Sequence, residues 1–216
     1  MKNNITELVF ILDRSGSMSK LVSDTVGGFN SLIERQKEVD GKCYVTTVLF
    51  DTRIERLHDR LDLQQVPEMT RRDYVPGGCT ALLDAVGSTI EHIVSIHRYA
   101  RPEDVPENTL FVITTDGLEN ASHRFTKEQI RQMVEKEQEK YGWQFIFLGA
   151  NIDAFDAGRG LGFRPEHITN FMADSEGMES NYRSVGKAVT AARCCAPIDG
   201  SWKEDAEADY NRRKRR

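Results

Sequence analysis

Three oxygen-bearing side chains stand on alternate positions after an apolar run near the N-terminus. The run LVFIL, residues 8–12, stops at Asp13, and Ser15 and Ser17 follow on either side of Gly16. A carboxylate in this position can act as a nucleophile that forms an acyl phosphate, or it can join the two hydroxyls as a ligand of a hard cation. The choice between these chemistries depends on what else the fold brings to the same place.

A second carboxylate follows another apolar run. The segment TTDG, residues 114–117, places Asp116 directly after that run. If both runs are parallel strands of one open α/β sheet, Asp13 and Asp116 lie at the edge where such sheets bind ligands. Two close carboxylates repel each other unless a cation lies between them, and hydroxyls add ligands without adding charge. An oxygen-only donor set favours Mg²⁺ over thiophilic metals.

The strands that position these residues are expected in apolar runs rich in β-branched and aromatic residues. Four such runs cover residues 8–12, 44–50, 109–115 and 143–149, and a last strand is expected near 167–171. Only Asp51 and Thr52 separate the second run from RIERL, which predicts an antiparallel hairpin. We therefore expect an α/β fold: a doubly wound, Rossmann-like three-layer sandwich with a mostly parallel six-stranded sheet and one antiparallel edge strand.

Helices are expected between the strands. Apolar residues at helical spacing predict helices after Ser19, over about 81–97 and over about 179–193, and a capping box at Thr126 opens another. Gly27 and Gly28 weaken the first helix, and we expect them where that helix packs closely on the sheet.

Composition indicates one ordinary globular domain. The 216 residues are 39% hydrophobic and 29% charged, and no apolar run approaches the length of a membrane span. The first apolar run is too short for a secretory signal, so a cytoplasmic location is expected. The four cysteines form no CxxC pair, which excludes a zinc ribbon or thioredoxin-type motif. The five histidines show no paired ligand spacing.

The C-terminus carries a basic cluster on an acidic chain. The net charge is −5 although residues 212–216 are all basic. We expect this terminus to be solvated and disordered. It has no interleaved aromatic residues, so nucleic acid is not an expected partner.

Three segments together resemble one known family. DRSGS fits the D-x-S-x-S element of von Willebrand factor type A (VWA) domains, GGCTALLDAV at 77–86 is similar to their threonine loop, and TTDG to their second-aspartate loop. The resemblance covers about residues 5–195 and leaves 196–216 as a polar C-terminal tail. It extends to small stand-alone VWA proteins of bacteria and their phages.

The resemblance implies a metal ion-dependent adhesion site (MIDAS). Ser15, Ser17 and Thr80 would be direct or near-direct ligands, and Asp13 and Asp116 would bind directly or through water. The metal would be Mg²⁺, with Mn²⁺ or Ca²⁺ as alternatives. The expected function is non-enzymatic: a metal-dependent protein-binding module that captures an Asp or Glu carboxylate of a partner protein.

Two other functions stay open at this stage. One is a Mg²⁺-dependent phosphohydrolase, but haloacid-dehalogenase-like enzymes need a second aspartate where this chain has Ser15. The other is a VWA scaffold with a purely structural metal. A G-x-S-x-G nucleophile elbow and a P-loop are both absent from the sequence.

Neighbouring residues receive structural interpretations. The resemblance implies that Asp84 supports the loop and does not bind the metal, and we expect Glu119 and Asn120 either to line the binding rim or to belong to a surface loop. Cys79 is expected to be a packed small residue, with a redox effect on the metal loop as an alternative. Trp143 and Trp202 are expected to have packing roles.

Overall fold

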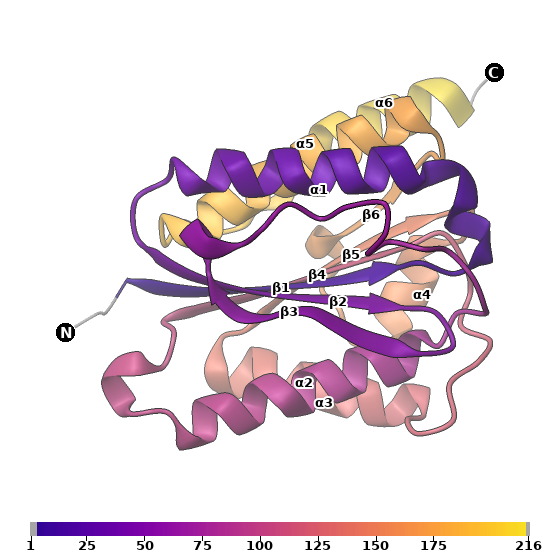
Figure 1. Ribbon diagram of the computed structural model, residues 1–216. Helices are drawn as coiled ribbons and strands as arrows, with labels where there is room; N and C mark the ends of the chain where they lie inside the picture. The colour runs from indigo at the N-terminus through magenta and orange to yellow at the C-terminus, as the bar shows by residue number, and fades with distance from the viewer. Residues whose placement is uncertain (1–3, 215–216) are drawn as a thin grey trace.

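The computed structural model describes residues 4–214 and shows a central sheet between two layers of helices (Figure 1). The strand order is β3-β2-β1-β4-β5-β6. The strands are β1 (Ile5–Asp13), β2 (Lys42–Phe50), β3 (Ile54–Asp62), β4 (Asn108–Thr115), β5 (Gln144–Ala150) and β6 (Ile168–Phe171). β3 runs antiparallel to β2, and the other pairings are parallel. The predicted sheet, with its antiparallel edge strand, is confirmed.

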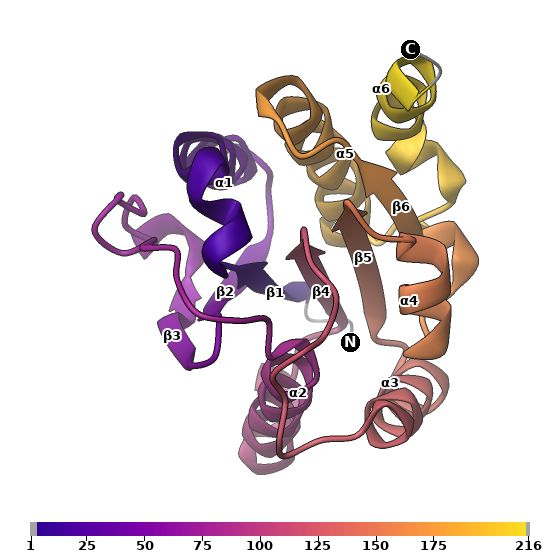
Figure 2. The same ribbon diagram turned by 90° about the vertical axis from the view of Figure 1, so that its right-hand side faces the viewer.

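Six helices flank this sheet in the part of the chain that the structure describes. They are α1 (Val22–Lys37), α2 (Leu82–Tyr99), α3 (Lys127–Tyr141), α4 (Ala154–Gly160), α5 (Ser175–Arg193) and α6 (Glu204–Lys214). Helices α1 and α5 cover one face, and α2, α3 and α4 the other (Figure 2). The predicted capping box is present, because Thr126 and Gln129 bond each other's backbone at the start of α3.

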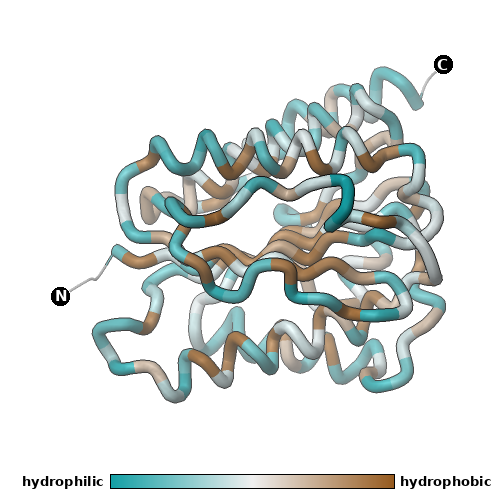
Figure 3. Tube along the Cα trace, viewed as in Figure 1, coloured by the Kyte–Doolittle hydropathy of each residue, from teal (hydrophilic) through white to brown (hydrophobic). Residues whose placement is uncertain are grey.

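The sheet supplies side chains to two hydrophobic cores because successive residues of a strand point to opposite faces. In β1, Leu8, Phe10 and Leu12 join the core under α1 and α5, whereas Val9 and Ile11 join the core over α2 and α3. Figure 3 shows the resulting apolar centre beneath largely polar outer helices. A strand buried on both faces explains the unbroken apolar run in the sequence.

The sequence predicted a disordered basic C-terminus. This prediction is wrong for residues up to Lys214, which are ordered in the structure. Trp202 is buried at 3% exposure, as its expected packing role requires, and its indole Nε1 donates to the Glu166 carbonyl at 3.0 Å. Helix α6 follows and packs along α5 and β6 (Figure 2). Arg213 forms ion pairs with Asp174, Glu176 and Asp209. Part of the basic cluster is therefore neutralised within the chain, and the domain boundary expected at residue 195 stays a prediction.

The glycine pair of α1 also differs from expectation. A Cβ on Gly28 would collide with the ring of Tyr182 in α5, whereas one on Gly27 would meet no atom within 4 Å. Gly28 therefore permits close packing between two helices, and not between the helix and the sheet. The sequence analysis did not predict the short helix α4.

A search of residues 4–214 for a helix long and apolar enough to cross a lipid bilayer finds none.

Candidate metal centre

The predicted site residues meet at the edge where the parallel strands end, which faces the viewer in Figure 2. Asp13 is the last residue of β1, and Asp116 directly follows β4, which is hydrogen-bonded to β1. Ser15 and Ser17 open the first turn before α1, and Thr80 lies just before α2. The chain passes from β1 to a helix on one face of the sheet and from β4 to a helix on the other face. The edge between these two strands is therefore a topological switch point.

The Asp13 carboxylate is almost fully buried, with 1% of the residue exposed. Its Oδ1 accepts from the Ser15 backbone N–H at 2.7 Å, and its Oδ2 accepts from the Thr115 hydroxyl at 2.6 Å. Burial raises the pKa of Asp13, because it disfavours the charged form more than these hydrogen bonds favour it. The two hydrogen bonds thus fix the orientation of the Asp13 carboxylate, but they do not fully compensate its loss of hydration.

The two serine hydroxyls connect the first carboxylate loop to the second. The Ser17 hydroxyl donates to Asp116 Oδ1 at 2.6 Å, and its Oγ lies 3.1 Å from Ser15 Oγ. Burial also raises the pKa of Asp116, which is 5% exposed. Among residues 4–214, no Lys, Arg or His forms an ion pair with Asp13 or Asp116. Two desolvated carboxylates therefore converge without a protein cation between them.

Thr80 is held against the second loop by its own backbone. Its N–H donates to Asn120 Oδ1 at 2.9 Å, and its carbonyl accepts from the Asn120 N–H at 3.1 Å. The Thr80 hydroxyl oxygen lies 3.2 Å from the position that a Cβ on Gly117 would take. The structure thus brings Thr80 beside Asp116, and all five predicted residues lie in one cluster.

Two carboxylates behind the site fasten its loops together. Asp84 accepts from the backbone N–H groups of His123, Arg124 and Phe125. Asp84 therefore supports the connection between β4 and α3, which follows the second-aspartate loop. Glu119 accepts from the Leu83 N–H at 2.8 Å and from nearby backbone groups of its own loop, so it ties that loop to the start of α2.

Three supporting residues were not singled out from the sequence. Thr115 orients Asp13, as described above. The buried Tyr74 hydroxyl donates to the Asp13 backbone carbonyl. Arg14 bonds Asp51 at 3.2 Å and Glu55 at 2.7 Å, which attaches the hairpin of β2 and β3 to the site. The role of Thr115 could have been predicted, because a hydroxyl at the end of a buried strand needs a hydrogen-bond partner. The sequence around Tyr74 and Arg14 gives no comparable indication.

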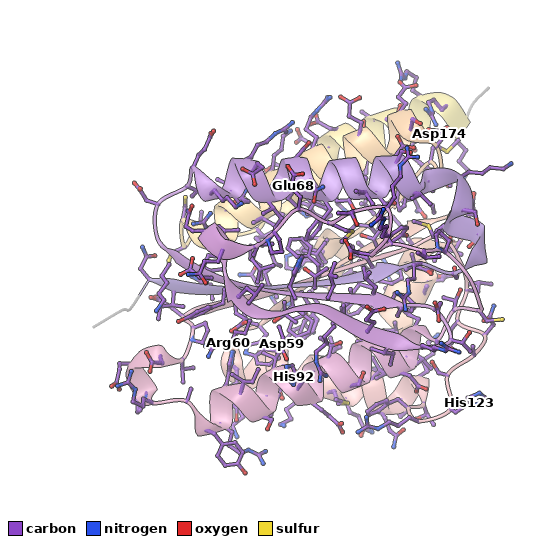
Figure 4. All side chains as sticks on the ribbon, viewed as in Figure 1. Asp59, Arg60, Glu68, His92, His123 and Asp174 are labelled. Carbon is purple, nitrogen blue, oxygen red and sulfur yellow. The ribbon has the colours of Figure 1, made fainter. Side chains whose placement is uncertain are left out.

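The cysteine and histidine side chains do not gather into a second metal-binding cluster in the described part of the chain. Cys79 is exposed, so its expected packing role is wrong, whereas Trp143 is buried as predicted. His92 lies beside Asp59 on α2 and β3, and His123 lies far from both at the strand-end edge (Figure 4). Within the described part of the chain, no three His, Cys, Asp or Glu side chains form a metal-binding group. The cluster's donors are therefore two carboxylates and three hydroxyls, which suits a hard divalent cation.

The strand order, the antiparallel edge strand and the flanking helices define the chain's fold as that of a VWA domain. Solved structures of this fold confirm the resemblance. The search of protein families finds no matching model, and the search of curated proteins finds no match.

Proximal thread matrix protein 1 from the mussel byssus superposes with a TM-score of 0.61 at 14% identity, over 86% of this chain and 46% of that one. Another structure of that protein has a zinc-occupied MIDAS motif. A VWA protein from Catenulispora acidiphila gives 0.58 at 11% identity, over 86% and 43%. Manganese-loaded TRAP protein of Plasmodium vivax gives 0.56 at 18% identity, over 83% and 72%. This chain spans less than half the length of the first two proteins.

Proposed function

We propose that this chain is a metal-dependent protein-binding module in which Asp13, Ser15, Ser17, Thr80 and Asp116 hold a Mg²⁺ ion. The observation that carries the proposal is the buried pair Asp13 and Asp116, which has no cationic partner among residues 4–214 and whose loops are linked through the Ser17 hydroxyl. A divalent cation would offset the loss of hydration of both carboxylates and the repulsion between them. The zinc-occupied motif of the byssus protein and the manganese-loaded TRAP protein support this type of ligand, and Mn²⁺ or Ca²⁺ could replace Mg²⁺.

The donor set favours capture of a further anion. Three of its five oxygen donors are neutral hydroxyls, so the residues do not surround the site with excess negative charge. Asp13 and Asp116 are buried, but Gly16 and Ser17 are exposed, which leaves a path to solvent on that side. When bound, the cation would supply the attraction for an Asp or Glu carboxylate of a partner protein. The chain's own part is to hold the ligands and to surround the contact.

Binding is favoured over catalysis by the group that stands two residues after Asp13. Phosphohydrolases that use an aspartyl nucleophile place a second carboxyl there as a general acid, and this chain has the Ser15 hydroxyl, 3.1 Å from Ser17 Oγ. A serine hydroxyl is a very weak acid and cannot take that role. We therefore infer that the site does not break bonds.

The test is affinity capture from the native lysate with Mg²⁺, with a chelator, and with Asp116→Ala in Mg²⁺. Asp156→Ala is the matched control, because Asp156 is exposed at the same edge and outside the cluster. We expect wild type and the control to retain a partner protein only with Mg²⁺. Substitution of one carboxylate residue of that partner should abolish its binding.

Two outcomes would contradict the proposal. A partner that binds folded Asp116→Ala as well as wild type would indicate a scaffold with a structural metal. Turnover of a generic phosphate ester that is lost in Asp13→Ala would indicate a hydrolase.

A further inference from the structure

Large exposed hydrophobic residues gather around the candidate metal centre. The structure describes five such residues. Ile54 opens β3, and Val75 and Leu118 lie on loops, all three at the strand-end edge, while Tyr99 and Tyr141 lie at helix ends elsewhere. Single exposed apolar residues are ordinary, but their concentration beside one polar site indicates a contact surface.

Val75 and Leu118 are attached closely to the site. Val75 directly follows Tyr74, whose hydroxyl bonds the Asp13 carbonyl, and it is 60% exposed. Leu118 is two residues after Asp116 and is 65% exposed. Both loops are fastened by several backbone hydrogen bonds, among them Gly77 to Arg14 and Asn120 to Thr80. The two side chains are therefore held at the opening of the site without being buried by the chain itself.

We propose that the partner presents a protein segment in which the captured carboxylate is flanked by apolar side chains. This inference rests on the proposed function and assigns its specificity. Val75 and Leu118 contact the flanking apolar residues. The metal ion alone would not distinguish among carboxylates, so these side chains select the partner.

The test is selection from a displayed heptapeptide library, random except for a central Asp, with Mg²⁺ or with a chelator. Wild type should enrich apolar residues beside the Asp, only with Mg²⁺. The double variant Val75→Ser/Leu118→Ser should lose the apolar preference but still select Asp peptides in Mg²⁺. Tyr99→Ser is the control, because it removes an exposed apolar residue outside the site loops.

A selected peptide then gives the size of the effect. Its affinity should fall roughly tenfold in the double variant, as expected for loss of two partly buried apolar contacts, and should be unchanged in Tyr99→Ser. A Mg²⁺ titration of the double variant, equal to that of wild type, shows that the metal centre is intact.

The experiment distinguishes failure of the proposed function from failure of this further inference. If wild type selects no Mg²⁺-dependent peptide, the proposed function fails. If it selects Mg²⁺-dependent Asp peptides without apolar neighbours, or if the double variant keeps the same preference, the proposed function stands and the assignment of Val75 and Leu118 is wrong.

Discussion

At the scale of single residues, the candidate site depends on hydroxyl groups as much as on carboxylates. Ser17 connects the two aspartate loops, and Thr115 holds Asp13 by a 2.6 Å hydrogen bond. The sequence predicted Asp13, Ser15 and Ser17 because they adjoin one strand. It predicted Asp116 because that residue directly follows another strand, and Thr80 only through the resemblance of residues 77–86 to the threonine loop of VWA domains. Tyr74 could not be predicted, because its contact with Asp13 spans 61 positions and depends on the path of an irregular loop.

Thr115→Val tests this scale. The substitution keeps the side chain's shape but removes the donor to Asp13 Oδ2, so the carboxylate loses the group that orients it. We expect Mg²⁺ affinity to fall by about 10- to 100-fold, as is typical when a partner of a metal ligand is lost. Isothermal titration measures the change. Thr109→Val, at the other end of β4, is the control and should bind Mg²⁺ as wild type does; equal loss in both variants would refute the role of Thr115.

At the scale of elements, the sequence predicted strands better than it predicted helix contacts. Buried strands leave continuous apolar runs, and the hairpin left a connection too short for a crossover. Helices α4 and α6 left no such signal: α4 has seven residues, and α6 carries mostly charged ones. Their burial comes from contacts with distant elements, such as Arg213 with Asp174, which no local pattern records.

Gly27 and Gly28 provide a prediction about the packing of α1 on α5. Gly27→Ala should stabilise the protein by about 1 kcal/mol, because alanine favours a helix and nothing lies within 4 Å of the new Cβ. Gly28→Ala should destabilise it by about 1–3 kcal/mol, since the new methyl group meets the Tyr182 ring. Urea denaturation gives both free energies of unfolding. The same sign for both variants would contradict this packing.

At the scale of the whole molecule, the segment after α5 packs against α5 and β6. His167, directly before β6, has an Nε2 atom 3.0 Å from the Ile198 carbonyl and is 4% exposed. Burial lowers the pKa of His167, more than the bond to Ile198 raises it. The unfolded chain therefore binds a proton at His167 more readily than the folded one, and stability falls as the pH drops below about 6.5.

His167→Gln tests that dependence, since glutamine cannot take up this proton and can still donate to the Ile198 carbonyl. Unfolding is followed by urea denaturation at several pH values from 8 to 5 in one chelator-containing buffer. We expect wild type to lose more stability than the variant over this range. Parallel pH profiles for the two proteins would show that His167 does not contribute.

The central claim is that two buried aspartates and three hydroxyls form one divalent-cation site. The most direct measurement is isothermal titration of Mg²⁺ into wild type and Asp116→Asn, with Asp156→Asn as the control. The account predicts one Mg²⁺ per chain for wild type and control, and binding that is lost or at least about tenfold weaker in Asp116→Asn. Absence of binding to folded wild type, or equal binding to Asp116→Asn, would contradict it.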